Sequence, residues 1–206
     1  MIKNIIFDFG NVLLNLDENA TMDALTSILD SSKCLDLDKM VFFPFEKGLI
    51  SEEAFFHRLQ SRSKIILQGD IYYAAWNAML LDFPEKRIQM LKALRNQYKI
   101  FLLSNTNITH LRKVKRNFEK EIGLLEFDKL LFDKAYFSHE IGMRKPDLEI
   151  YQYIVEDMKL IPSECLFIDD KIENTVAAGN FGMHVHHLQP AQEISEIIQD
   201  LIKNVN

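Results

Sequence analysis

Short runs of apolar residues recur along the chain, and each of them ends abruptly at polar residues. The run "NIIF" ends at Asp8, and the run "IFLL" ends at Ser104. Amphipathic helical patterns separate these runs, and such alternation is typical of β–α–β units in a parallel sheet, whose strands are buried on both faces. The predicted strands are 3–7, 100–103, a segment ending near Ser138, a segment ending at Asp169 and Asp170, and 183–188; the predicted helices are 85–95, 107–118, 147–158, 173–181 and 191–202.

Residues 15–84 interrupt this alternation of apolar runs and helical patterns. They contain helical patterns such as "ENATMDALTSIL" and "SEEAFFHRLQ", many phenylalanines and no clear strand. A helical segment that follows the first strand can cover the edge of the sheet where ligands bind. The sequence therefore predicts an α/β fold with a Rossmann-like parallel sheet core, formed by residues 1–14 and 85–206, and an inserted α-helical cap formed by residues 15–84.

Composition narrows the class of partner. The chain has 206 residues, of which 48% are hydrophobic, and a net charge of −6. These values suit one core with an insertion, whereas nucleic-acid binders are usually basic. No apolar run approaches the roughly 18 residues that span a bilayer. Cys34 and Cys165 form no metal-binding or disulfide pattern. We expect a cytoplasmic monomer or homodimer that acts on a small molecule and binds neither nucleic acid nor a membrane.

Carboxylates follow the predicted strands where a parallel sheet binds its ligands. Asp8, Asp169 and Asp170 would gather at one edge, and two such charges about 4 Å apart repel by about 4 kcal/mol at an effective dielectric constant near 20. The cluster needs a cation or a shared proton, and oxygen ligands favour Mg²⁺ with a phosphate. Lys145 could neutralise the cluster and hold a phosphate oxygen. Further candidates for anion binding are Ser104, Asn105, Asn11 and the backbone after Asp8, where Gly10 would ease a tight turn.

Four segments together resemble the motifs of the haloacid dehalogenase superfamily of hydrolases that use an aspartate nucleophile. They are "FDFGNVL", "FLLSNTN", the lysine of "GMRKPD" and "FIDDKIEN", and their order and spacing span the predicted core. The insertion resembles the helical cap of that superfamily. The segments "FGNVLLNLD" and "EKGLISEEAF" are most similar in sequence to the α-glucose-1-phosphate phosphatase-like subgroup of small bacterial sugar-phosphate phosphatases.

This resemblance implies a role for each motif residue. Asp8 would attack phosphorus and form an aspartyl-phosphate, and Ser104 and Lys145 would bind the transferring phosphoryl group. The implied Mg²⁺ ligands are Asp8, the carbonyl of Gly10, Asp170, and Asp169 directly or through water; Asn174 would orient the loop or the lysine.

Gly10 departs from the pattern, because phosphatases of this superfamily usually carry an aspartate at that position as the general acid and base. General acid–base help is typically worth about 10²–10⁴-fold in rate. Three explanations stay open. The leaving group could depart without protonation, as from an anomeric or acyl phosphate. A cap residue could substitute, in the order Glu46, His57, Lys47. The leaving group could instead be halide.

The paired carboxylates at 169 and 170 favour a metal-bearing site, and dehalogenases of this superfamily work without a metal. The prediction is therefore a Mg²⁺-dependent phosphatase of small phosphorylated metabolites, with sugar phosphates favoured and Glu46 as a substrate-binding candidate in the cap. The alternatives are a metal-free 2-haloacid dehalogenase that uses the same Asp8, and a weakly active regulator that binds a phosphorylated ligand.

Overall fold

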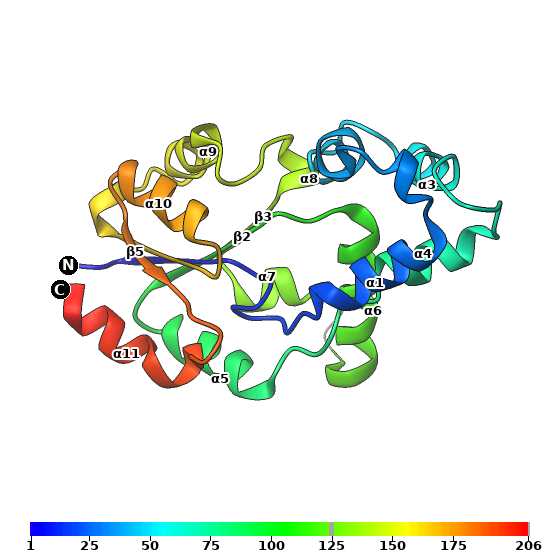
Figure 1. Cartoon of the computed structure of the whole chain (residues 1–206). Helices are drawn as coiled ribbons and strands as arrows, with labels where there is room; N and C mark the ends of the chain where they lie inside the picture. The colour runs from blue at the N-terminus through cyan, green and yellow to red at the C-terminus, as the bar shows by residue number, and fades with distance from the viewer. Residues whose placement is uncertain (124–125, 206) are drawn as a thin grey trace.

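The computed structural model describes residues 1–123 and 126–205, and within them one parallel sheet forms the centre of the larger part of the molecule (Figure 1). The strand order is β3-β2-β1-β4-β5. The predicted α/β fold with a Rossmann-like sheet is therefore confirmed. The strands are β1 (Asn4–Phe7), β2 (Lys99–Ser104), β3 (Lys134–Phe137), β4 (Cys165–Asp169) and β5 (His184–His187).

Helices cover both faces of the sheet. Ile5 and Phe7 of β1 pack into one hydrophobic cluster, whereas Ile6 packs into the other. This alternation explains why successive residues in the middle of β1, β2 and β4 are apolar. The first cluster includes residues of α5 (Glu85–Leu94), α6 (Ile108–Ile122), α7 (Phe127–Leu131) and α11 (Ile194–Val205), and the second includes residues of α9 (Leu148–Met158) and α10 (Ile172–Asn180).

The structure differs from the sequence prediction at several helix ends. Helix α6 continues to Ile122, where Gly123 adopts a left-handed conformation with φ 72° and ends the helix. Helix α11 begins at Ile194 instead of residue 191. Two short helices, α7 and α8 (Ser138–Ile141), were not predicted, because segments of four or five residues carry little periodicity. No helix in the described ranges is long and apolar enough to cross a membrane.

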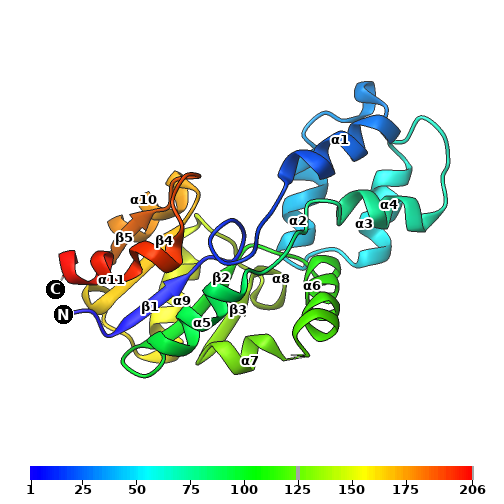
Figure 2. The same ribbon diagram turned by 90° about the horizontal axis from the view of Figure 1, so that it is seen from below.

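A second group of helices lies apart from the sheet, at the end of the molecule away from both termini (Figure 2). It has its own hydrophobic cluster, in which Phe42, Phe45, Phe55 and Trp76 are buried. We propose that this group is the core of the cap, with the boundaries predicted above. Its elements are α1 (Glu18–Ile28), η1 (Ser31–Lys33), η2 (Asp38–Phe42), α2 (Phe43–Glu46), α3 (Glu52–Gln60) and α4 (Gly69–Trp76).

Two chain segments join this group to the sheet, and they pair with each other. Leu16 and Leu80 form an antiparallel bridge, and the N–H of Asn15 donates to the carbonyl of Asp82 over 2.8 Å. The N–H of Leu81 donates back to Asn15 over 3.1 Å. The helical group is therefore attached through a short two-stranded connection directly after the loop that follows β1.

Candidate active site

The loop after β1 begins with Asp8, whose N–H donates to the carbonyl of Ile168 in β4 over 2.8 Å. The tight turn that was expected at Gly10 is made by Asn11 instead, with φ 56°. Asparagine tolerates this left-handed region better than most residues. The Asn11 side chain donates to Oδ2 of Asp170 over 3.1 Å, so it orients a carboxylate of the site.

Lys145 lies at the centre of the site and is only 1% exposed. Its Nζ donates to Oδ1 of Asp8 over 2.5 Å, to Oδ2 of Asp169 over 2.6 Å and to the carbonyl of Leu103 over 2.8 Å. An ammonium has three hydrogens, so all of them are used. The Asn105 side chain exchanges two hydrogen bonds of 2.9 Å with the backbone of Lys145 and fixes the segment that carries it.

Asp169 is fully buried and acts as an acceptor for several groups. The Asn174 amide donates to Oδ1 over 2.9 Å and to Oδ2 over 3.0 Å. The backbone N–H of Lys171 donates to Oδ1 over 2.8 Å. With the bond from Lys145, these contacts occupy both oxygens, so Asp169 holds the lysine in place.

The three carboxylates carry more negative charge than Lys145 neutralises. Burial raises the pKa of Asp8 from 3.8 to about 7, against the opposing effect of Lys145. Burial also raises the pKa of Asp170, although the bond from Asn11 opposes the shift. Burial would lower the pKa of Lys145, but Asp169 and Asp8 outweigh it and raise this pKa.

The carboxylates also have the geometry of a cation site. One oxygen each of Asp8, Asp169 and Asp170 can be chosen so that all lie within 4.8 Å of one another. All these donors are carboxylate oxygens, which hard divalent cations prefer. The excess negative charge and the donor set together fit Mg²⁺.

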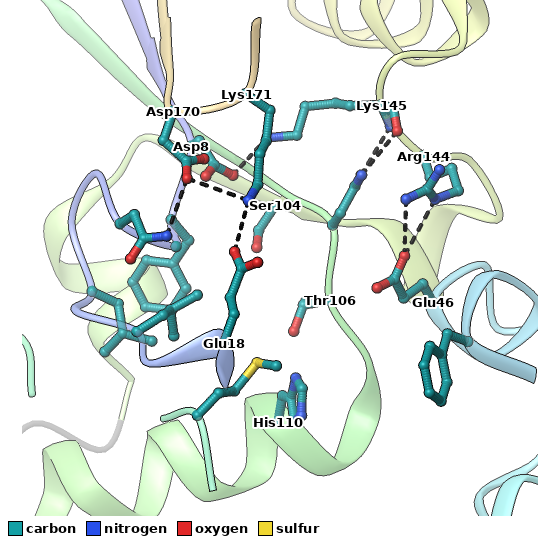
Figure 3. Close-up of a pocket in the computed structure, with 18 of the residues that line it drawn as sticks. Asp8, Glu18, Glu46, Ser104, Thr106, His110, Arg144, Lys145, Asp170 and Lys171 are labelled. Carbon is teal, nitrogen blue, oxygen red and sulfur yellow. Dashed lines mark hydrogen bonds and ion pairs between the residues drawn. The ribbon is translucent and has the colours of Figure 1, made fainter. Parts of the chain in front are cut away.

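A pocket of about 430 Å³ opens from this cluster toward the helical group. On one side, Lys171 Nζ lies 2.8 Å from Oε1 of Glu18 and 3.7 Å from Oδ2 of Asp170 (Figure 3). On the other side, Arg144 contacts Oε2 of Glu46 over 3.2 Å, and its guanidinium carbon lies 3.9 Å from the ring centre of Phe43. Ion pairs between core and helical group therefore flank the pocket.

The structure brings together most of the residues that the sequence singled out. Asp8, Ser104, Lys145 and Asp170 line the same pocket, and Asp169 lies directly beneath them. The side-chain amides of Asn11 and Asn105 donate hydrogen bonds to other protein groups, although both residues line the pocket.

The three candidate residues of the cap differ in their position relative to the pocket. Glu46 lines the pocket and is paired with Arg144, and its burial raises its pKa against the effect of that partner. Lys47 instead contacts Asp147 over 3.1 Å, and His57 is exposed on α3; neither lines this pocket.

Sequence reasoning missed several pocket residues. Arg144 and Lys171 directly neighbour motif residues, which is a usable signal, but neighbouring charged residues are common on surfaces. His110 is buried against Trp76, with ring centres 4.9 Å apart, and burial lowers its pKa to about 4. Its imidazole is therefore neutral near pH 7. No motif marks it, because its position depends on how α6 meets the helical group.

Comparison with known proteins supports a family assignment. A family described as haloacid dehalogenase-like hydrolase matches residues 2–182. The D-ribitol-5-phosphate phosphatase of Bacteroides thetaiotaomicron is 31% identical over 84% of this chain and 85% of the relative. A sesquiterpene phosphatase of Aspergillus oryzae is 29% identical over 90% of this chain and 89% of the relative.

A solved structure agrees with these relatives. It is a haloacid dehalogenase family enzyme from Bacteroides thetaiotaomicron in complex with magnesium and inorganic phosphate. It superposes with a TM-score of 0.85 at 32% identity, covering 96% of this chain and 99% of that chain.

Proposed function

The chain belongs to the haloacid dehalogenase-like hydrolase family, and on this premise we propose that it is a Mg²⁺-dependent phosphatase that hydrolyses small phosphorylated metabolites. The observation that carries the proposal is the buried arrangement of Asp8 beside Lys145 and Asp170, which line one pocket. A relative of the same fold that holds magnesium and phosphate supports it.

Asp8, Asp170 and the carbonyl of Gly10 are the groups that would hold Mg²⁺ directly. Asp169 is engaged by Lys145 and Asn174, so it would act through these neighbours or through water. When bound, the metal supplies positive charge that keeps Asp8 ionised and stabilises charge on phosphoryl oxygens.

Asp8 then serves as the nucleophile. A carboxylate oxygen attacks phosphorus, the bond from phosphorus to the ester oxygen breaks, and the ester oxygen leaves with its electron pair. Water next attacks the aspartyl-phosphate, which releases inorganic phosphate and regenerates the carboxylate. Lys145 holds Asp8 in position and places an ammonium beside the phosphoryl oxygens, one of which would replace a present acceptor of Nζ. Ser104 would donate its hydroxyl hydrogen to the same group.

The pocket suits a small metabolite, and we propose sugar phosphates as the favoured class. Glu46 and Arg144 place charged groups opposite the carboxylate cluster, where they could bind hydroxyl groups of a substrate (Figure 3). The helical group covers the pocket and would exclude water during the reaction.

A substrate panel tests the proposal. Phosphate release would be measured from a set of phosphorylated metabolites and p-nitrophenyl phosphate, with Mg²⁺ and with EDTA, alongside halide release from 2-chloropropionate. We expect phosphate release that requires Mg²⁺. Metal-independent halide release would identify a dehalogenase instead. Tight binding of a phosphorylated compound without turnover would identify a binding protein.

A further inference from the structure

Gly10 lies directly beside the side chain of Leu16. A Cβ built at position 10 would lie 2.6 Å from Cδ1 of Leu16, so this terminal methyl group would have to move to admit a side chain. The φ of Gly10 is not positive, so the backbone itself does not require glycine here. Leu16 therefore occupies the space that a side chain at position 10 would need.

The pocket wall around Gly10 is apolar. Gly10 forms a bridge with Leu14, and Leu16 forms a bridge with Leu80. Leu14, Leu16 and Leu80 all line the pocket and belong to, or pack against, the large hydrophobic cluster of the core. A leaving group that emerges beside Gly10 would thus face leucine side chains.

Besides Asp8 and Asp170, four carboxylates line the described part of the pocket. Glu18 is paired with Lys171 and Glu46 with Arg144, across the pocket from each other (Figure 3). Asp38 and Glu173 are exposed. None of these residues belongs to the leucine wall beside Gly10.

We propose that this enzyme prefers phosphate esters whose leaving group departs without being protonated by the protein: aryl, enol, acyl and anomeric sugar phosphates in preference to simple alkyl phosphates, which include sugar phosphates esterified at a primary hydroxyl. The inference rests on the proposed phosphatase function. The ester oxygen leaves as an anion with the electron pair of its bond to phosphorus and takes its proton from solvent. An acidic leaving group carries that charge readily, whereas an alcohol does not.

The test compares kcat/KM for p-nitrophenyl phosphate, phenyl phosphate and ribitol 5-phosphate, a primary alkyl phosphate, in the presence of Mg²⁺. We expect kcat/KM to fall at least about 100-fold across the series, the lower end of the typical contribution of general acid catalysis. A fall of less than about tenfold overturns the inference while leaving the phosphatase function intact. Absence of phosphate release from every member overturns the phosphatase function, and this inference with it.

Variants test whether the missing acid at position 10 causes the dependence of kcat/KM on the leaving group. The double variant Gly10→Asp with Leu16→Ala restores both an acid and the space for it, and should raise alkyl phosphate hydrolysis relative to p-nitrophenyl phosphate about tenfold or more. Leu16→Ala alone is the matched control, and its kcat/KM should depend on the leaving group as steeply as that of the wild type. If Glu18→Gln or Glu46→Gln steepens the dependence further, that carboxylate already acts as the acid and the inference is wrong. If the double variant does not fold, the comparison of the three substrates with the wild-type enzyme still tests the inference.

Discussion

The two walls of the pocket are built differently. The core wall is a hydrogen-bonded network in which Lys145, Asp169 and Asn174 are buried: Lys145 and Asn174 both donate to Asp169. The opposite wall consists of separate ion pairs, such as Lys171 with Glu18, whose side chains are 45% and 48% exposed. A rigid wall keeps reacting groups in place, whereas isolated partly exposed pairs can separate at little cost. The core wall is thus suited to chemistry and the other wall to opening and to selecting substrates.

The largest effect should follow from damage to the core wall at Lys145. Lys145→Met leaves Asp8 and Asp169 buried without their cation, which should cost about 3–5 kcal/mol of unfolding free energy in EDTA. Turnover with Mg²⁺ should fall about 10²–10³-fold, because charge on the phosphoryl group loses a partner. Urea denaturation and steady-state kinetics measure the two effects. Wild-type turnover in this variant would show that the network is not catalytic.

A second prediction concerns the charge of the core wall without metal. Because the pKa of Asp8 is raised from 3.8 to about 7, its contribution to stability is fully present below pH 3.8 and is lost as the pH rises through about 7. Asp8→Asn should therefore be more stable than the wild type at pH 8 in EDTA, by roughly 1–3 kcal/mol. The difference should shrink toward pH 4. Denaturation midpoints across this range provide the measurement, and a difference independent of pH would contradict the raised pKa.

The opposite wall should respond more weakly and more selectively. Glu46→Gln removes a charge from the pocket, so KM for a sugar phosphate should rise by about tenfold, the equivalent of one charged hydrogen bond. For p-nitrophenyl phosphate, which has no hydroxyl groups to bind, kcat and KM should change little. Glu53→Gln, an exposed change on α3 outside this pocket, is the control. Equal losses on both substrates would argue against a role in selecting substrates.

The smallest effect should come from a single ion pair between the core and the helical group. Glu52→Gln should cost about 0.5 kcal/mol, and the loss should diminish as salt is added. A double-mutant cycle with Arg112→Gln isolates the pair. A coupling above about 2 kcal/mol would mean that the helical group is held as firmly as the residues of the core wall.

The same contrast explains what could be predicted from sequence. Asp8, Ser104 and Asp169 each follow an apolar run, and parallel topology brings the ends of such runs to one edge. The opposite wall gives no such signal. Glu46 and Lys47 are neighbours in sequence, yet one faces the pocket and the other contacts Asp147. Their directions depend on the packing of short helices.

Packing also determines the structural consequence of a glycine at position 10. The absence of a side chain there is visible in the sequence, but the leucine that fills the space lies six residues further along. Periodicity does not reveal this contact, since it depends on the two-stranded connection between Leu16 and Leu80.

The central claim is that Asp8 attacks phosphorus. The most direct test is to mix the enzyme with p-nitrophenyl phosphate and Mg²⁺, stop the reaction in acid and locate covalent phosphate by peptide mass spectrometry. We predict phosphate on Asp8 in the wild type, and in Asp8→Asn no labelled peptide and a turnover reduced by more than about 10⁴-fold with the fold retained. Phosphate on a different residue, or wild-type turnover by Asp8→Asn, would contradict the account.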